Sequence, residues 1–211
     1  ISAPPTEGGC PAFDLIGAYA ASARSVTYLS TTGVYGDLQG GWAMEWTRPN
    51  PTSERARRRV RAEQLWQAAS DTVRIVRLPG IYGPGRSALD RVRAGKARRI
   101  VRKGQVFSRI HVNDIATGLK ALLEARCVGV FHICDDAAAP PQDVIAYASD
   151  LLQVAPPPDV PFEQADLSDM ARSFYSECKR VSNAKIKAAT GWRPLYPTYR
   201  EGLKAIQAAG R

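Results

Sequence analysis

SVTYLSTTGVYGD, residues Ser25–Asp37, is the stretch of sequence that decides the fold. Its first half is apolar and β-branched, as in a buried strand, and its second half is small, polar and rich in glycine. RLPGIYGPG at Arg77–Gly85 repeats this pattern of a strand that ends in a turn. In α/β proteins such strand ends present backbone and hydroxyl groups to a ligand. The two stretches therefore predict a parallel sheet with a nucleotide-type site at its carboxyl edge.

A helix is predicted between the two strands. The cluster Pro49–Ser53 offers N-cap residues, and Glu54 places a negative charge in the first turn, where the helix dipole favours it. The helix is expected over Glu54–Ala69, with one apolar face on the sheet. The residues expected on that face are Ala62, Leu65, Trp66 and Ala69. With the strands Ser25–Ser30 and Val73–Leu78, this helix makes one βαβ unit of an α/β fold.

The rest of the chain continues the alternation of strands and helices. Further strands are expected at Arg98–Val101, Gln105–Val112 and Gly129–Asp135. Helices are expected at Ser87–Ala94, Gln142–Leu152 and Ser182–Thr190 and after Pro197. A further helix is expected to begin at a cap formed by Asn113 or Asp114 and to end at Gly129. Its apolar stripe includes Ile115, Leu119 and Leu122. The four prolines of Pro156–Pro161 predict a rigid connector.

The composition is that of an ordinary folded domain with an excess of positive charge. Of the 211 residues 45% are hydrophobic, and 29 Lys and Arg against 20 Asp and Glu give a net charge of +9. Such an excess favours anionic partners, from phosphates to nucleic acid. A basic nucleic-acid-binding module is one alternative, for which the affinity should fall steeply with salt. A solvated basic surface is the other, and it is favoured because no recognition motif accompanies the charge.

Cysteine usage and hydropathy limit the remaining classes. The four cysteines are widely spaced and contain no CxxC pair, and with two histidines they form no metal-binding pattern. Buried free thiols in a reducing cytoplasm are therefore expected. No stretch approaches the roughly 18 apolar residues of a membrane span, so no membrane contact is expected.

Motifs in a fixed order resemble one known superfamily. They are YLSTTGVYGD at residues 28–37, a Pro-Thr-Ser step before the helix that carries Glu63, RLPGIYGPG, FSRIHVNDIATGL at residues 107–119, GVFHICDD at residues 129–136 and AKIKAATGWRP at residues 184–194. This set is similar to the extended and atypical short-chain dehydrogenase/reductases, the NAD-dependent epimerase/dehydratase proteins. The resemblance implies a Rossmann-type parallel sheet over residues 1–135, and a small C-terminal substrate region with the closing helices over residues 136–211.

The beginning of the chain departs from the superfamily pattern. There, the first strand leads into a glycine-rich turn whose amides face the pyrophosphate of the cofactor. ISAPP at Ile1–Pro5 resembles the end of a strand, and no such turn precedes it. If ISAPP corresponds to the fourth strand, about three βα units, or roughly 90 residues, come before it in relatives. The chain is therefore expected to be the back part of a larger protein, with the first strands missing and one sheet edge open.

The resemblance also implies NAD or NADP as cofactor and a small or sugar-like substrate for an oxidoreductase or epimerase. Thr31, four residues before Tyr35, matches the catalytic hydroxyl, and Tyr35 is a second, weaker catalytic candidate. The implied cofactor-binding residues are Ala3, Pro4, Thr31, Arg59, Pro79, Gly80 and Ile81. The substrate-binding candidates are Arg86, Ser108, Arg109 and His111. Each has a structural alternative, such as a capped strand end for Thr31, a turn for Pro79 and Gly80, and a helix start for His111.

The catalytic Tyr and Lys of the superfamily are not found at their expected positions. Counting back from Glu63, the Lys position holds Arg59 and the Tyr position holds Arg55. Arginine stays protonated near neutral pH and cannot act as an acid/base. Arg59 is expected to hold a ribose or phosphate as a fixed donor, or else to be a solvated helix charge. A cofactor-binding or scaffold protein without catalysis is therefore an alternative function. Superfamily members often pair through this helix, which also allows a homodimer.

Overall fold

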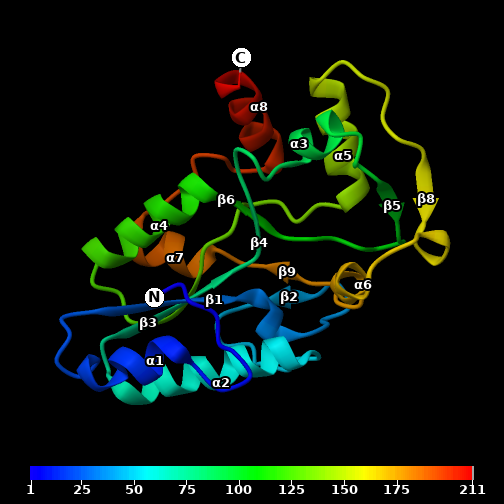
Figure 1. The fold of residues 1–211 in the computed structure, drawn as a ribbon. Coiled ribbons are helices and arrows are strands. Elements are labelled where there is room, and N and C mark those ends of the chain that lie inside the picture. Colours follow the sequence, from blue (N-terminus) through cyan, green and yellow to red (C-terminus); the bar gives the residue numbers. More distant parts are fainter. Residues whose placement is uncertain (211) are drawn as a thin grey trace.

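The computed structural model describes residues 1–210 as an α/β fold around a small parallel sheet (Figure 1). The sheet has the order β1-β3-β7 and consists of β1 (Val26–Thr31), β3 (Val73–Leu78) and β7 (Gly129–His132). Both strand pairs are parallel, and Thr31 lies opposite Leu78. The two strands of the predicted βαβ unit are therefore confirmed. Because the strands are parallel, their carboxyl ends lie at one edge of the sheet.

The first residue of the chain pairs with β1 on the side away from β3. The amino group of Ile1 donates to the carbonyl oxygen of Thr27 at 2.7 Å, and the N–H of Leu29 donates to the carbonyl oxygen of Ile1 at 2.8 Å. This is the hydrogen-bond pattern of a parallel pair, as expected for a strand end. Ala3 and Pro4 follow this pairing and are exposed.

Helices cover both faces of the sheet. On one face, Ile75 packs in a cluster with α2 (Glu54–Ala69). On the opposite face, Val76 packs in a cluster with α4 (Val112–Glu124) and α7 (Ala184–Thr190). Neighbouring strand residues point to opposite faces, and every residue of β3 is buried. The sequence of this central strand is therefore apolar except for Arg74 and Arg77.

Helix α2 has the predicted bounds and the predicted cap. The hydroxyl of Ser53 accepts a hydrogen bond from the N–H three residues further on at 3.2 Å. Ala62 and Trp66 face the sheet as predicted. The prediction for Leu65 is wrong, because this side chain is 41% exposed. Glu63 is buried instead, so the buried face is rotated by about one residue from the purely apolar stripe.

The remaining strands form three short parallel pairs. These are β2 (Trp42–Ala43) with β9 (Arg180–Val181), β4 (Gly80–Tyr82) with β6 (Arg109–His111), and β5 (Arg99–Val101) with β8 (Asp159–Pro161). Strand β8 corrects the prediction that Pro156–Pro161 is only a connector. A proline is compatible with such an edge strand because its missing N–H faces away from the partner or ends the ladder.

The other helices complete the C-terminal part and the N-terminal flank. The α-helices not yet given are α1 (Pro11–Ile16), α3 (Ala88–Arg93), α5 (Pro141–Leu151), α6 (Asp169–Tyr175) and α8 (Tyr199–Ala209), and the 3-10 turns are η1 (Gly17–Tyr19), η2 (Thr32–Tyr35) and η3 (Phe162–Gln164). Helices α3, α5 and α8 gather beyond β4 and β6, away from the β1-β3-β7 sheet (Figure 1), around a core that includes Leu89 and Leu203. Across residues 1–210, no helix combines the length and apolar character needed to cross a membrane.

Both predicted ends of helix α4 need correction. Its N-cap is His111, whose Nδ1 accepts a hydrogen bond from the N–H of Asn113 at 3.2 Å. Asp114 is buried and accepts hydrogen bonds from two backbone N–H groups of the loop before α8, at 2.6 and 3.2 Å. The helix ends at Glu124, and Gly129 opens strand β7. The side chain of Asp114 thus ties α4 to the C-terminal part rather than capping the helix.

Candidate functional site

The carboxyl ends of β1 and β3 bring several predicted site residues to one edge of the sheet. The hydroxyl of Thr31 accepts a hydrogen bond from the N–H of Gly33 at 3.2 Å and caps η2. Pro79 follows the strand position opposite Thr31, and the next two residues, Gly80 and Ile81, are exposed. Thr31 therefore has the structural role of capping the turn after its strand. It is nevertheless only half-buried, and it lies at the same sheet edge as the exposed residues Gly80 and Ile81.

The glycine that ends η2 is required by the backbone. Gly36 has φ 65° and ψ −149°, a conformation that side chains disfavour. A Cβ atom at this position would also clash with the backbone carbonyl oxygen of Asn50. The turn after β1 therefore passes directly against the loop that leads into α2.

Tyr35 lies inside a buried chain of hydrogen bonds. Its hydroxyl is 2.7 Å from Nη1 of Arg77 and 2.6 Å from Nε2 of His132. Nδ1 of His132 lies 2.9 Å from the carbonyl oxygen of Ser182, which can only accept, so Nδ1 carries the proton and Nε2 accepts from Tyr35. The order of donation is therefore Arg77 to Tyr35 to His132 to Ser182, and the carbonyl oxygen of Met44 is a second, more distant acceptor for the Tyr35 hydroxyl at 3.1 Å. Burial raises the pKa of Tyr35 to about 12 and lowers the pKa of His132 to about 4, so both groups are neutral at pH 7.

A buried ion pair anchors this chain to the sheet and to α2. Nη2 of Arg77 lies 2.6 Å from Oε2 of Glu63, and Nε of Arg77 also donates to the same carboxylate. The hydroxyl of Ser30 donates to Oε1 of Glu63. Ser30 immediately precedes Thr31, so the network holds η2 at both of its ends. The position of Tyr35 favours a structural role, because its hydroxyl is fully buried and already hydrogen-bonded.

Arg59 reaches from α2 to the same strand. Its Nη1 donates to the carbonyl oxygen of Leu29 at 3.0 Å and to the hydroxyl of Tyr28 at 2.9 Å, and its guanidinium lies 5.5 Å from the centre of the Tyr28 ring. Leu29 is two residues before Thr31. The structure therefore places a fixed cation close to the strand end that carries Thr31.

Comparison with known proteins decides the family. Residues 12–134 match the model of the NAD dependent epimerase/dehydratase family. The chain belongs to this family. The superfamily resemblance and the Rossmann-type fold predicted from the sequence are thereby confirmed.

Three proteins to which this chain is similar differ in identity and in the share of the chain that they match. A solved structure of a functionally unknown conserved protein from Silicibacter pomeroyi is 52% identical, with a TM-score of 0.93, over 100% of this chain and 76% of that chain. A 3-diazoavenalumate denitrifying reductase from Streptomyces is 29% identical over 74% of this chain and 54% of its own length. The chain thus spans about half of this curated relative. The dTDP-glucose 4,6-dehydratase of Bacillus anthracis, solved in complex with NAD, has a TM-score of 0.73 at 20% identity over 94% of this chain and 65% of its own, which shows the shared fold.

Arg55 and Arg59 are the residues that the sequence predicts at the family's Tyr and Lys positions. The guanidinium of Arg55 lies 5.5 Å from the centre of the Phe174 ring in α6, and Arg55 is exposed. Three other arginines of α2 pair with Glu54 at the start of the helix, at 2.6 to 3.6 Å: Arg57, Arg58 and Arg61. Part of the positive charge that suggested nucleic-acid binding is therefore balanced within the helix itself.

The predicted substrate-binding residues take up mostly structural positions. Oγ of Ser108 accepts a hydrogen bond from the N–H of Val181 at 3.0 Å. Nη1 of Arg109 donates to two backbone carbonyl oxygens, at 2.8 and 3.0 Å. His111 caps α4 and packs edge-on against two tyrosine rings, at 5.2 and 4.4 Å between ring centres. Arg86 is exposed in a turn. Of these four candidates, Arg86 is the one whose side chain is open to solvent.

Asp135 is a buried acid that the sequence did not single out. Its residue surface is 3% exposed, and neither carboxylate oxygen has a hydrogen-bond partner within residues 1–210. Its N–H donates to the carbonyl oxygen of Arg109 at 2.8 Å. Burial raises the pKa of Asp135 to about 8, although the nearby Arg109 guanidinium acts in the opposite direction. The side chain is therefore largely protonated and neutral at pH 7.

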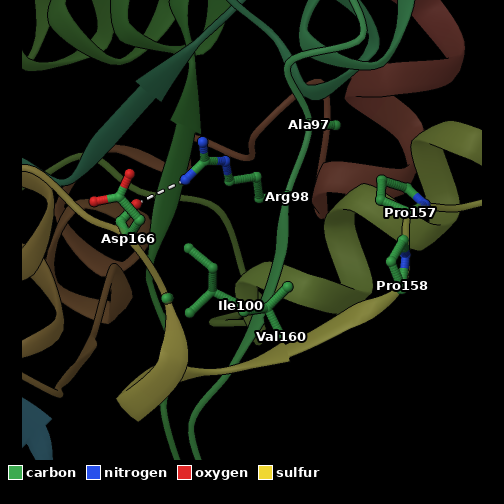
Figure 2. Close-up of a pocket in the computed structure, with 8 residues that line it drawn as sticks. Ala97, Arg98, Ile100, Pro157, Pro158, Val160 and Asp166 are labelled. Atoms are coloured by element: carbon green, nitrogen blue, oxygen red, sulfur yellow. Dashed lines mark hydrogen bonds between the residues drawn. The ribbon is translucent and has the colours of Figure 1, made fainter.

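Two hollows in the surface lie outside the predicted residues. The first, between β5 and β8, has a volume of about 240 Å³ and mostly apolar walls (Figure 2). At its rim Nη1 of Arg98 donates to the backbone oxygen of Asp166 at 2.7 Å. The second has polar walls and a volume of about 270 Å³. It begins at Asp37, the last residue of the quoted motif, but its other walls come from distant segments that sequence spacing does not connect.

Proposed function

We propose that this chain binds NAD or NADP at the carboxyl ends of β1 and β3 and acts as an oxidoreductase or epimerase on a small or sugar-like substrate. The observation that carries the proposal is that Thr31, Arg59 and the segment Pro79–Ile81, whose last two residues are exposed, lie at one sheet edge. Ligands of open α/β sheets bind at the carboxyl ends of the strands. Membership of the NAD dependent epimerase/dehydratase family supports the same site.

The residues at this edge fit the nicotinamide half of such a cofactor. Arg59 is a permanently charged donor that can bond a ribose hydroxyl or a phosphate. Gly80 is exposed at this edge, so a flat ring can reach its backbone. A bound nicotinamide supplies hydride transfer to or from the substrate. Thr31 would orient a substrate oxygen through its hydroxyl, which keeps its proton to donate while it accepts from Gly33.

Proton transfer is the step for which this chain lacks the Tyr and Lys that the family uses. Arg55 and Arg59 stand at the positions of the family's Tyr and Lys, and neither can exchange a proton near pH 7. A guanidinium can still stabilise negative charge that develops on a substrate oxygen. This observation favours a second candidate function, a cofactor-binding protein without turnover. Tight dinucleotide binding with no turnover over a broad panel of carbonyl substrates would favour the second candidate.

We also propose a cytoplasmic location. All four cysteines are free thiols, although two of them are only partly buried. Free thiols persist in reducing compartments.

The cofactor proposal predicts that Arg59→Met weakens binding of NAD or NADP by about tenfold. The reason is the loss of one charge-assisted hydrogen bond, worth about 1.5 kcal/mol or more. Binding is measured by calorimetric titration of each dinucleotide. Arg61→Met is the matched control, because Arg61 lies on the same helix and pairs with Glu54. Equal affinity of both variants would remove Arg59 from the cofactor site.

A further inference from the structure

The polar hollow that begins at Asp37 has walls from three distant segments. One is the turn after η2 with Asp37 and Gln39, and the second is the loop of residues 102–105 between β5 and β6. The third is residues 175–178, from the last residue of α6 into the loop before β9. We call this hollow the anion pocket, defined by its lining residues Asp37, Gln39, Arg102, Lys103, Gly104, Gln105, Tyr175, Ser176 and Cys178.

Hydrogen bonds fix the walls of the anion pocket to one another. The N–H of Cys178 donates to Oδ1 of Asp37 at 2.7 Å, and the carbonyl oxygen of Cys178 accepts from two N–H groups of the turn at 3.1 and 2.8 Å. Nε2 of Gln105 donates to the carbonyl oxygen of Glu177 at 2.8 Å. Arg102 donates to the carbonyl oxygen of Tyr175. The three segments therefore form a preorganised cavity.

The charged groups of the anion pocket have distinct tasks. The carboxylate of Asp37 is committed to the wall, where it accepts from the N–H groups of Cys178 and Gln39. Burial opposes its ionisation, but these two hydrogen bonds and the nearby cations outweigh burial and lower the pKa of Asp37. Arg102 is ordered by its bond to a carbonyl oxygen and by the ring of Phe162, 5.0 Å away. Arg102 and Lys103 are both exposed residues of the lining.

The two cations and the small size define the ligand class. A volume of about 270 Å³ lies just below the range of roughly 300 to 1,000 Å³ that is usual for sites of drug-sized ligands. A whole nucleotide sugar does not fit within it. Guanidinium and ammonium groups on neighbouring residues suit a carboxylate or a phosphate group.

We propose that the anion pocket binds the oxyanion of a small acidic substrate, through Arg102 and Lys103. Binding of the oxyanion stands on the cavity and its cations alone. Its assignment to the substrate rests on the proposed function, since the turn that carries Thr31 runs directly into the pocket wall at Asp37.

The test is a titration of the isotope-labelled protein with inorganic phosphate and, separately, with glycolate, followed by amide NMR shifts at constant ionic strength. We expect saturable shifts in residues 37–39, 102–105 and 175–178. Lys103→Gln should weaken the binding by about threefold to fivefold, as for loss of one exposed ion pair. Lys96→Gln removes an exposed lysine outside the pocket and should leave the affinity unchanged.

The outcomes separate this proposal from the cofactor proposal. If phosphate binds more tightly than glycolate, the preferred group is a phosphate, and in the opposite case it is a carboxylate. Either result supports oxyanion binding in the anion pocket. Absence of saturable shifts in the three segments, or equal weakening by both lysine variants, overturns it. A repeat with NAD present shows whose oxyanion is bound: if NAD displaces phosphate, the oxyanion belongs to the cofactor and the substrate assignment is wrong. If NAD does not bind at all, the pocket stands and the cofactor proposal fails.

Discussion

Replacing Arg77 by methionine is expected to lower the free energy of unfolding by about 3–5 kcal/mol, the usual cost of breaking a buried ion pair from one side. The substitution leaves the Glu63 carboxylate buried without its cation, and it removes the donor to Tyr35. Both partners of the pair are almost fully buried, so water cannot replace the lost contacts. Urea unfolding followed by circular dichroism measures the loss.

A matched double variant separates charge burial from packing. Glu63→Gln combined with Arg77→Met removes the uncompensated carboxylate, and it should recover part of the stability lost by Arg77→Met alone. A loss below about 1 kcal/mol for the single variant, the size seen for exposed pairs, would mean that the pair does not anchor the turn at Thr31.

Replacing Asp135 by asparagine is expected to stabilise the fold increasingly as the pH rises. The folded protein holds the Asp135 proton up to a pKa of about 8, whereas an unfolded aspartate loses it near 3.8. The wild-type protein therefore loses stability as the pH rises through this window, because deprotonation favours the unfolded chain. Asparagine cannot ionise. The stability gained by Asp135→Asn should therefore be larger at pH 7.5 than at pH 5, by roughly 3 kcal/mol at most.

The free energies of unfolding of the wild type and of Asp135→Asn must be compared at each pH, because His132, which both proteins contain, also makes stability depend on pH. Burial lowers the pKa of His132 to about 4, so wild-type stability also falls as the pH drops from about 6.5 towards 4. This slope has the opposite sign to that of Asp135 and cancels when the variant is compared with the wild type. Asp150→Asn, at an exposed position of α5, serves as control. A gain that does not change with pH would show that Asp135 is ionised in the fold.

Local signals in the sequence were sufficient for the βαβ unit. The N-cap at Ser53 and the bounds of α2 follow from cap chemistry and composition, which act within one helical turn. These local signals did not predict the whole buried face of α2 correctly, because Leu65 is exposed. The buried partner of Arg77 is Glu63. A prediction of the buried helix face that counts apolar residues alone does not include such an acid.

Contacts between distant segments could not be predicted in the same way. Strand β8 lies in a proline-rich stretch and forms only by pairing with β5, 60 residues earlier. Histidine is not among the usual N-cap residues, so the sequence indicated a helix start at His111 only as an alternative to substrate binding, and the structure decides for the cap. The same holds for the site. Thr31 ends β1 opposite Leu78, the residue before Pro79, as a parallel pair of these two strands requires, whereas the anion pocket joins three segments that no motif connects.

The measurement that tests the central claim most directly is amide hydrogen exchange of the protein with and without NAD or NADP. We predict slower exchange in residues 31–36 and 80–82 when the dinucleotide is present, because these segments form the sheet edge at which the cofactor is proposed to bind. Protection confined to other segments, or no protection at saturating dinucleotide, would contradict it.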